Sequence, residues 1–311
     1  MRNLVGVPKI AYFGPSGTFT EMALDQLETS GIFDGPVDRV AATSPPATLQ
    51  MVRDGLVDGA VVPIESSVEG AVVPTLDSLA LGERLQIVAE TELDIAFTIL
   101  GRPGIERLDQ VRSVRAYPVA VGQVRVWLEE HCPGAEIQTA SSNAGAAEDV
   151  AAGIADAAVS TALAGRRLGL RTLADGVADV SGARTRFVLV TAPVPVPART
   201  GGDRSSAVLQ PPNVPGSLVS VLSEFATRGI DLIRIESRPV RTDPGSYRFF
   251  VDCIGHIDDP LVAEAFRALH RKSTVRFLGS WPAANPSGPP PPSDSEAADW
   301  IERIRQGDRE S

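Results

Sequence analysis

The sequence predicts an α/β fold with mostly parallel sheets, followed by a smaller ferredoxin-like βαββαβ domain. From residue 9 to about residue 190, short apolar segments alternate with segments of helical periodicity, which is the order of a parallel sheet. Residues 192–202 are rich in proline and then in glycine, which is typical of a linker. Beyond the linker, the order strand, helix, strand, strand, helix, strand is that of the split βαβ arrangement.

The first region is built from alternating strands and helices. The predicted strands are Lys9–Phe13, Gly59–Ile64, Ser113–Ala116 and Ala157–Ser160, with further strands inside the apolar stretch Leu85–Leu100. The predicted helices are Thr20–Thr29, Ala47–Asp54, Ala120–His131, Ala144–Gly153 and Ala162–Leu168. Parallel sheets bind ligands at the carboxyl ends of their strands, so we expect the functional residues in the loops that follow these strands.

The second region and the tail follow the linker. The predicted strands are Ser205–Leu209, Ile230–Pro239, Arg248–Gly255 and Val275–Trp281, and the predicted helices are Gly216–Thr227 and Pro260–His270. A run of four prolines, Pro289–Pro292, indicates an extended tail. Past it, apolar residues from Ala297 to Ile304 recur at helical spacing, which predicts a short amphipathic helix with Trp300 as a packing residue.

The composition limits the possible classes of function. A chain of 311 residues is long enough for about two to three domains. No apolar run approaches the ~18 residues of a membrane span, and Met1–Pro8 lacks the regions of a secretory signal. The only two cysteines, Cys132 and Cys253, fall in different predicted domains, and the three histidines have no metal-ligand spacing with them; this favours a reducing cytoplasm and argues against a zinc site. The net charge of −10 argues against nucleic acid as a partner, so any anionic ligand needs a local cluster of donors.

Four hydroxyl-rich loops follow predicted strands. They are Gly14–Glu21, Val62–Gly70, Ser141–Asn143 and Ser160–Thr161. Thr18 with Glu21, and Ser66 with Glu69, have the spacing of a capping box that begins a helix. Exposed amides at a helix start bind anions. Each loop alone is equally consistent with a turn and an ordinary cap, but together they indicate a two-lobed cleft for a small polyanion.

A further loop, Ser181–Val190, runs into an apolar strand and places Thr185 between Arg184 and Arg186. The Arg186 guanidinium is suited to bidentate binding of a carboxylate, and the Thr185 hydroxyl offers a neutral proton donor beside it. This pairing suits an anionic substrate that must lose a hydroxide equivalent. The alternative interpretation is an ordinary polar loop ahead of a buried strand.

These segments resemble the signature blocks of the prephenate dehydratase family. The blocks are Gly14-Pro-Ser-Gly-Thr-Phe-Thr20, Pro63-Ile-Glu65 with Ser67 and Gly70, and Thr185-Arg-Phe187, in the family's order and spacing. Gly216–Val219 and Glu236–Pro239 resemble the two motifs of its regulatory ACT domain. The resemblance implies a two-lobed catalytic domain over residues 8–192, similar to the type II periplasmic-binding fold, a linker at 193–204, an ACT domain at 205–282 and a tail at 283–311. It also implies conversion of prephenate to phenylpyruvate, water and carbon dioxide without a cofactor or a metal.

The resemblance also implies roles for individual residues in the catalytic domain. Thr185 would be the catalytic donor to the leaving hydroxyl. The implied substrate-binding residues are Arg186, Phe187, Glu65, Ser67, Gly17, Thr18, Ser142 and Asn143. Arg186 and the helix starts would bind the carboxylates. Glu65 would instead orient a hydroxyl or Arg186, because like charges repel.

In the ACT domain the resemblance implies phenylalanine as a feedback inhibitor bound at a dimer interface, within a homodimer or homotetramer. The implied effector-binding residues are Asn213, Val214, Pro215, Gly216, Ser217, Leu218, Val219, Glu236, Ser237, Arg238 and Pro239. Amides at the helix start would bind the effector's carboxylate, and Glu236 or backbone carbonyls its ammonium group. The alternative interpretation is that these two segments are an ordinary turn and an ordinary strand end without a ligand.

The chain departs from the family's usual pattern at three positions. Ser66 stands where asparagine is usual, Tyr117 where histidine is frequent, and Ser217 where alanine is usual. Two alternatives also stay open: an arogenate dehydratase, and a non-catalytic amino-acid sensor. The intact Thr185-Arg-Phe187 motif weighs against the sensor, because a pure binder has no need of a proton donor. We expect no chorismate mutase segment ahead of the first block, which begins by Lys9.

Overall fold

The computed structural model describes residues 7–307, which form two compact units. The first unit contains residues up to 78 and residues 90–192; the second contains residues 79–89 and those from 193 onward. None of the helices between residues 7 and 307 is long and apolar enough to cross a membrane. The predicted α/β fold followed by a βαββαβ domain is confirmed.

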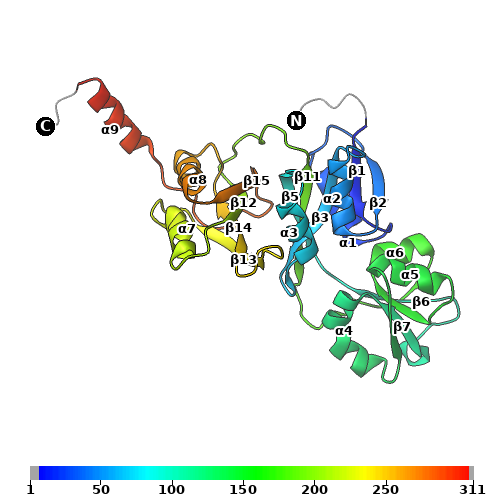
Figure 1. Cartoon of the computed structure of the whole chain (residues 1–311). Coiled ribbons are helices and arrows are strands. Elements are labelled where there is room, and N and C mark those ends of the chain that lie inside the picture. The colour runs from blue at the N-terminus through cyan, green and yellow to red at the C-terminus, as the bar shows by residue number, and fades with distance from the viewer. Residues whose placement is uncertain (1–6, 308–311) are drawn as a thin grey trace. The chain divides into compact units, whose positions relative to one another are not determined.

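The first unit has two lobes, each built around its own sheet (Figure 1). The sheet of lobe I has the order β2-β1-β3-β11-β5, with β4 pairing β3. Its strands are β1 (Lys9–Phe13), β2 (Asp38–Ala42), β3 (Gly59–Ser66), β4 (Gly70–Ala71), β5 (Gln86–Asp94) and β11 (Arg184–Thr191). Its helices are α1 (Phe19–Thr29), α2 (Pro45–Arg53) and α3 (Val73–Ala80). The strands β2, β1 and β3 are parallel, and β11 runs antiparallel to β3.

The sheet of lobe II has the order β10-β6-β9-β7-β8. Its strands are β6 (Thr98–Gly101), β7 (Ser113–Ala116), β8 (Glu136–Thr139), β9 (Ala157–Ser160) and β10 (Arg171–Asp175). Its helices are η1 (Leu108–Gln110), α4 (Pro118–His131), α5 (Asn143–Ala151) and α6 (Ala162–Leu168). Alanines of α5 pack with Leu100 and Ala158 in the core of this lobe. Because these side chains are small, the helix can approach the sheet closely.

The chain passes between the lobes twice, at residues 94–98 and 175–184, which we call the crossing segments. The two segments are hydrogen-bonded to each other. The Ile95 N–H donates to the Ala183 carbonyl at 2.7 Å, and the Val177 N–H donates to the Phe97 carbonyl at 3.1 Å. The crossing segments therefore form a paired connection between the lobes.

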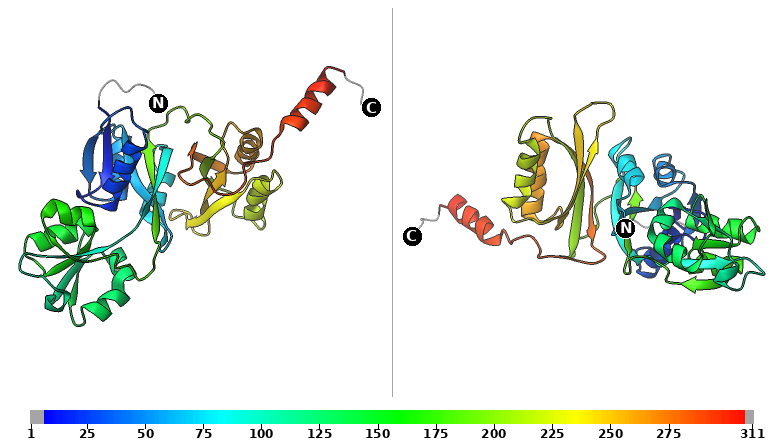
Figure 2. Two further views of the ribbon diagram at one scale, coloured as in Figure 1. Left: turned by 180° about the vertical axis from the view of Figure 1, so that it is seen from behind. Right: turned by 90° about the horizontal axis from the view of Figure 1, so that it is seen from below.

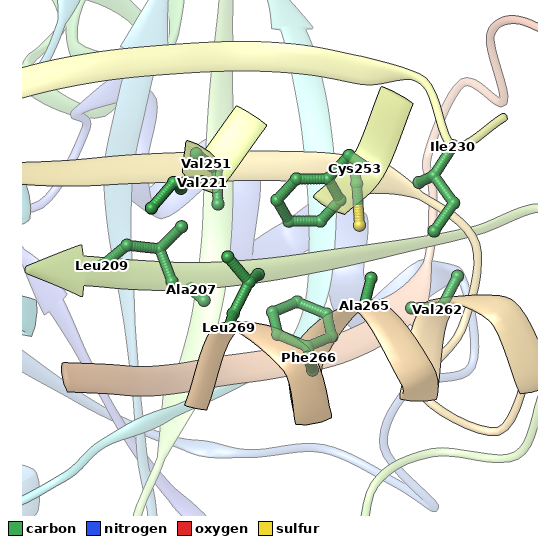
Figure 3. Close-up of a cluster of buried hydrophobic side chains, with 11 residues drawn as sticks. Ala207, Leu209, Val221, Ile230, Val251, Cys253, Val262, Ala265, Phe266 and Leu269 are labelled. Atoms are coloured by element: carbon green, nitrogen blue, oxygen red, sulfur yellow. The ribbon is translucent and has the colours of Figure 1, made fainter. Parts of the chain in front are cut away.

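The second unit contains an antiparallel sheet of order β13-β14-β12-β15, with α7 and α8 on the same face (Figure 2). Its elements are β12 (Asp203–Gln210), α7 (Ser217–Ala226), β13 (Leu232–Pro239), β14 (Tyr247–Ile254), α8 (Pro260–Lys272) and β15 (Thr274–Pro282). Figure 3 shows the core between sheet and helices, where Phe266 and Leu269 of α8 meet Ala207 and Cys253 of the sheet. The strands β13 and β15 are the two edges of this sheet.

The structure differs from the sequence-based expectations in several elements. The helices α3 and η1 and the strands β2, β4, β8 and β10 were not predicted. Of these strands, β2, β8 and β10 lie at sheet edges, so they lack the continuous apolar run of a strand buried on both faces. Ser66 accepts from the N–H groups of Val68 and Glu69 but caps a turn and not a helix, because β3 continues into a pairing with β4. The tail helix α9 (Ser295–Arg305) forms as predicted; it buries no residue and Trp300 is 45% exposed, so the packing role of Trp300 stays a prediction.

Candidate active site

A cleft of about 450 Å³ lies in the first unit and is lined by both lobes. This is the size range of pockets for small ligands. Lobe I contributes residues of the β1–α1 loop, of the β3–β4 turn and of β11, and lobe II contributes the starts of α4 and α5. The residues that line the cleft include Thr18, Phe19, Thr20, Pro63, Ser66, Glu69, Phe97, Tyr117, Gln123, Ser142, Asn143, Thr185 and Phe187.

Strand β11 presents Thr185 and Phe187 to the cleft and Arg186 to the opposite side. Thr185 and Phe187 line the cleft, as alternation along a strand requires. The pairing of β11 with β3 shifts register between Arg186 and Phe187, which lets Pro63 and Ser66 of β3 line the cleft as well. The Thr185 hydroxyl makes no hydrogen bond to any other residue between 7 and 307. It is therefore available to a ligand.

Arg186 is buried, with 5% of its side chain exposed, and it is paired with two carboxylates. One guanidinium nitrogen lies 2.9 Å from Glu65 Oε2, and another lies 3.2 Å from Glu90 Oε2. The predicted orienting contact of Glu65 to Arg186 is thus confirmed. Arg186 is not among the cleft-lining residues of the described chain, so its direct binding of a carboxylate stays a prediction. Strand alternation, which turns Arg186 away from Thr185, is the physical reason that it does not line the cleft.

Two helix starts open into the cleft, one from each lobe. Thr18 caps α1 by accepting from the Glu21 N–H at 3.4 Å, and Ser142 caps α5 by accepting from the Gly145 N–H at 2.9 Å. Both caps are buried cleft residues, with 5% and 3% exposure. A capping hydroxyl leaves the N–H groups of the first two helical residues without an intrahelical acceptor. These groups, at the positive ends of the helices, form anion-binding positions on opposite walls of the cleft.

The other predicted residues lie beside the cleft and support its walls. Gly17 has φ of +93° and packs against Ala164 of lobe II, and its carbonyl accepts from the Thr161 hydroxyl at 2.6 Å. Its N–H donates to Glu21 Oε2 at 2.6 Å, so the glutamate of the predicted capping box binds one residue earlier than expected. Ser67 Oγ accepts from the Arg184 N–H at 2.9 Å and so anchors the start of β11.

Asn143, Tyr117 and Gln123 complete the lobe II wall. The side-chain oxygen of Asn143 is buried without a hydrogen-bond partner in the described chain, so the amide can bind a ligand. Tyr117 follows β7 and precedes α4; the strand-end rule that predicted the other loops also applies to it. Gln123 is 7% exposed and lies within α4, where no local sequence feature marks it. Neither residue was predicted as a site residue.

The electrostatics of the cleft are set by dipoles. Glu69, which is exposed, is the single charged residue lining the cleft in the described chain. Anions must therefore be bound by helix starts, hydroxyls and amides.

The two cysteines are free and buried elsewhere, and burial raises the pKa of both the Cys132 and the Cys253 thiols, which makes them poor nucleophiles. No group of metal-ligating side chains is found between residues 7 and 307.

The residues expected to bind an effector form two groups, at the start of α7 and at the end of β13, and are exposed or half-buried. Gly216 adopts φ of +83° at the start of α7, and this helix has no side-chain cap. Val214 and Val219 on either side are 58% and 68% exposed. Glu236, Ser237, Arg238 and Pro239 end β13, an edge strand. This part of the second unit is an open surface and not an enclosed pocket.

Comparisons with known proteins agree with these features. A family model described as prephenate dehydratase matches residues 10–194, and one described as ACT domain matches residues 208–271. The prephenate dehydratase of Mycobacterium tuberculosis is 56% identical over 304 residues, covering 96% of this chain and 94% of the relative. The structure of prephenate dehydratase from Arthrobacter aurescens in complex with L-Phe is 38% identical with a TM-score of 0.87, covering 96% of this chain and all of that chain. The structure of GqqA, described as a novel type of quorum quenching acylase, is 28% identical with a TM-score of 0.72, covering 88% and 97%.

Proposed function

The chain belongs to the prephenate dehydratase family, and from that membership we propose how its cleft binds prephenate and removes the ring hydroxyl. The enzyme is a hydro-lyase that converts prephenate to phenylpyruvate, water and carbon dioxide. In this reaction the ring carboxylate leaves as carbon dioxide and its electron pair completes the aromatic ring. The hydroxyl leaves from the opposite ring carbon and takes up one proton to become water.

The observation that carries the proposal is the uncommitted Thr185 hydroxyl facing a cleft between two helix starts. Prephenate carries two carboxylates and one ring hydroxyl. The start of α1, at Thr18, and the start of α5, at Ser142 and Asn143, bind one carboxylate each. Thr185 donates a hydrogen bond to the departing hydroxyl. Because a threonine hydroxyl is a very weak acid, the bond stabilises the developing hydroxide and water supplies the net proton.

Phe187 and Arg186 support this arrangement in different ways. Phe187 provides an apolar wall of the cleft against the ring of the substrate. Arg186 acts from behind that wall, where its contacts with Glu65 and Glu90 fix β11 against β3 and β5. Ser67 and Gly17 hold the loops on either side. Substrate binding therefore depends on these four residues mainly through the shape of the cleft.

For regulation, we propose that L-phenylalanine binds the second unit at α7 and the end of β13 and lowers activity. The related structure from Arthrobacter aurescens is a complex with L-Phe, which supports the ligand. The exposure of Val214 and Val219 supports a site that two copies of the chain complete together, so we propose a homodimer or a homotetramer. Inhibition requires that phenylalanine bind the less active state more tightly.

We also propose a cytoplasmic location, which is supported by the two free cysteines and which cell fractionation would check.

An acylase activity like that described for GqqA receives no support from the cleft. Its lining in the described chain contains no histidine, lysine or cysteine, so the Ser–His, Ser–Lys and Cys–His pairs that form nucleophiles for acyl transfer are not present there. The closest alternative substrate is arogenate, in which an amino group replaces the keto group of the side chain. Exposed Glu69 at the cleft would attract that ammonium group, which makes arogenate worth testing.

The test is a turnover assay of the purified full-length chain with prephenate and with arogenate, following the aromatic product. We expect a higher kcat/KM for prephenate. A higher value for arogenate would reassign the substrate, and no turnover of either would favour the non-catalytic sensor. Calorimetric titration of phenylalanine, combined with sedimentation analysis, tests the effector and the oligomer together.

A further inference from the structure

Asp179, on the second crossing segment, makes three hydrogen bonds into the middle of α4. Its two carboxylate oxygens accept from the backbone N–H groups of Val126, at 3.0 Å, and of Trp127, at 2.9 Å. Its own N–H donates to the carbonyl of Gln123 at 2.7 Å. In a regular α-helix the Trp127 N–H would donate to that same Gln123 carbonyl.

These contacts open the hydrogen-bond ladder of α4 immediately after Gln123. Each backbone N–H has a single proton, so the carboxylate takes donors that the helix would otherwise use internally. Asp179 thus acts for the second half of α4 as a capping residue does at a helix start, although it comes from a distant segment. A polar group inserted into the ladder is a recognised cause of helix kinks. The opening lies where Gln123, which is 7% exposed, enters the cleft wall.

The same segment leads directly to Thr185. Asp179 lies between two further anchors, the Val177 N–H bonded to the Phe97 carbonyl at 3.1 Å and the Ala183 carbonyl bonded to the Ile95 N–H at 2.7 Å. Strand β11 begins at Arg184, next to Thr185. The Asp179 side chain therefore links α4, which contributes Gln123 to the cleft, to the segment that leads into β11 and Thr185.

We infer that Asp179 is a positioning residue for the dehydration: it holds Gln123 in the cleft and sets its place relative to Thr185. Asp179 itself does not line the cleft in the described chain. The Gln123 amide supplies one donor and one acceptor to the polar groups of the substrate. A carboxylate is needed at position 179 because it accepts two N–H groups at once, whereas an asparagine amide offers only one acceptor atom. This inference rests on the proposed binding of prephenate in the cleft.

The experiment is a double-mutant cycle on the full-length enzyme with prephenate. The variants are Asp179→Ala, Asp179→Asn, Gln123→Ala and the double variant Asp179→Ala with Gln123→Ala. Asp58→Ala is the control, because Asp58 is also exposed and also accepts a backbone N–H, from Lys9 at 2.8 Å. It precedes the first residue of β3, whereas the cleft is lined by Pro63 and Ser66 in the second half of that strand. For each variant kcat, KM and the melting temperature are measured.

We expect Asp179→Ala to lower kcat/KM by roughly tenfold, Asp179→Asn to lie between it and the wild type, and Asp58→Ala to match the wild type. In the Gln123→Ala background, adding Asp179→Ala should lower kcat/KM by less than about threefold, because residues that act as a unit are not additive. Independent effects that multiply would overturn the inference, as would unchanged kcat/KM in either single variant. If Asp179→Ala fails to fold, the Asp179→Asn cycle decides in the same way. The proposed function fails separately, if the wild type does not turn over prephenate.

Discussion

The catalytic cleft and the effector surface both use the start of a helix, but they differ in burial. In the cleft, the capping residues Thr18 and Ser142 are 5% and 3% exposed, and both are fixed by side-chain hydrogen bonds. At the effector surface, α7 begins at Gly216 without a side-chain cap, and the neighbouring Val219 is 68% exposed. The cleft is thus a finished binding site within one unit of one chain. The proposed effector surface, in contrast, is open to the surroundings in a single chain.

The sheet edge explains why the second site is open. Among the strands of residues 7–307, β13 pairs with β14 alone, so its other side presents backbone donors and acceptors to the surroundings. Ile235 and Tyr247, on β13 and its neighbour β14, are each 46% exposed. An apolar edge of this kind is a surface that another chain can cover. The difference in burial is what we expect if one chain suffices for catalysis while regulation requires a second chain at this edge, as proposed above.

The largest effect is expected when the hydroxyl of Thr185, the proposed proton donor, is removed from the catalytic cleft. We predict that Thr185→Ala lowers kcat by roughly 100- to 1000-fold with a much smaller change in KM, because the hydroxyl acts mainly in the transition state. Thr185→Ser keeps a hydroxyl and is the matched control. Steady-state kinetics with prephenate measures both. Near-wild-type kcat in Thr185→Ala would remove Thr185 from the chemistry.

The sequence predicted those parts of the cleft that depend on local order. Thr18, Ser142 and Thr185 follow or begin regular elements, so their position at a strand end could be inferred from the chain itself. The pairing of Arg186 with both Glu65 and Glu90 could not, because it joins residues that are far apart in the chain and depends on the order and register of the strands. Gln123 lies inside a helix, and only the contact from Asp179 distinguishes it. The missed strands β2, β8 and β10 lie at sheet edges of the first unit and have no continuous apolar run, whereas the edge strands β13 and β15 of the second unit were predicted.

A second test separates support of the cleft from direct binding of substrate. Arg186→Met leaves the Glu90 side chain, which is fully buried, without its paired guanidinium. Breaking a buried pair from one side costs about 3–5 kcal/mol, so we predict a fall in unfolding free energy of that order. Arg184→Met is the control: its pair with Asp94 is exposed on both sides, and such pairs contribute about 0–1 kcal/mol.

Chemical denaturation measures both arginine variants, and KM for prephenate is determined alongside. A raised KM with unchanged stability in Arg186→Met would support the direct carboxylate clamp. Equal stability loss in the two variants would contradict the difference in burial.

The effector surface can be tested at Gly216. A valine there must adopt φ near +83°, which is strained for a β-branched residue, and its side chain projects into open space at the start of α7. We predict that Gly216→Val weakens phenylalanine binding by about tenfold or more and reduces inhibition in proportion. Gly55→Val is the matched control, because Gly55 also has positive φ and open surroundings but lies in the first unit.

Calorimetric titration and inhibition curves give the effector affinity of both glycine variants. Full inhibition of Gly216→Val would indicate that phenylalanine competes in the catalytic cleft, and it would contradict the assignment of the effector site to the second unit.

The smallest expected effect concerns the ion pairs behind the effector helix. Hydrogen bonds from Lys272 of α8 and from Arg228 hold the pKa of Glu224 on α7 below its ordinary value of 4.5. A carboxyl whose pKa is lowered on folding stabilises the folded state above its ordinary pKa, and that stabilisation is lost as pH falls through the folded value. We therefore predict that Glu224→Gln lowers the melting temperature by about 2 °C at pH 7, and that the difference disappears well below pH 4.5. Glu264→Gln, which removes the exposed partner of Arg228, should have a smaller effect. Melting curves from pH 7 to pH 3 provide the measurement, and a difference that persists at pH 3 would mean that Glu224 supports α7 through packing and not through its charge.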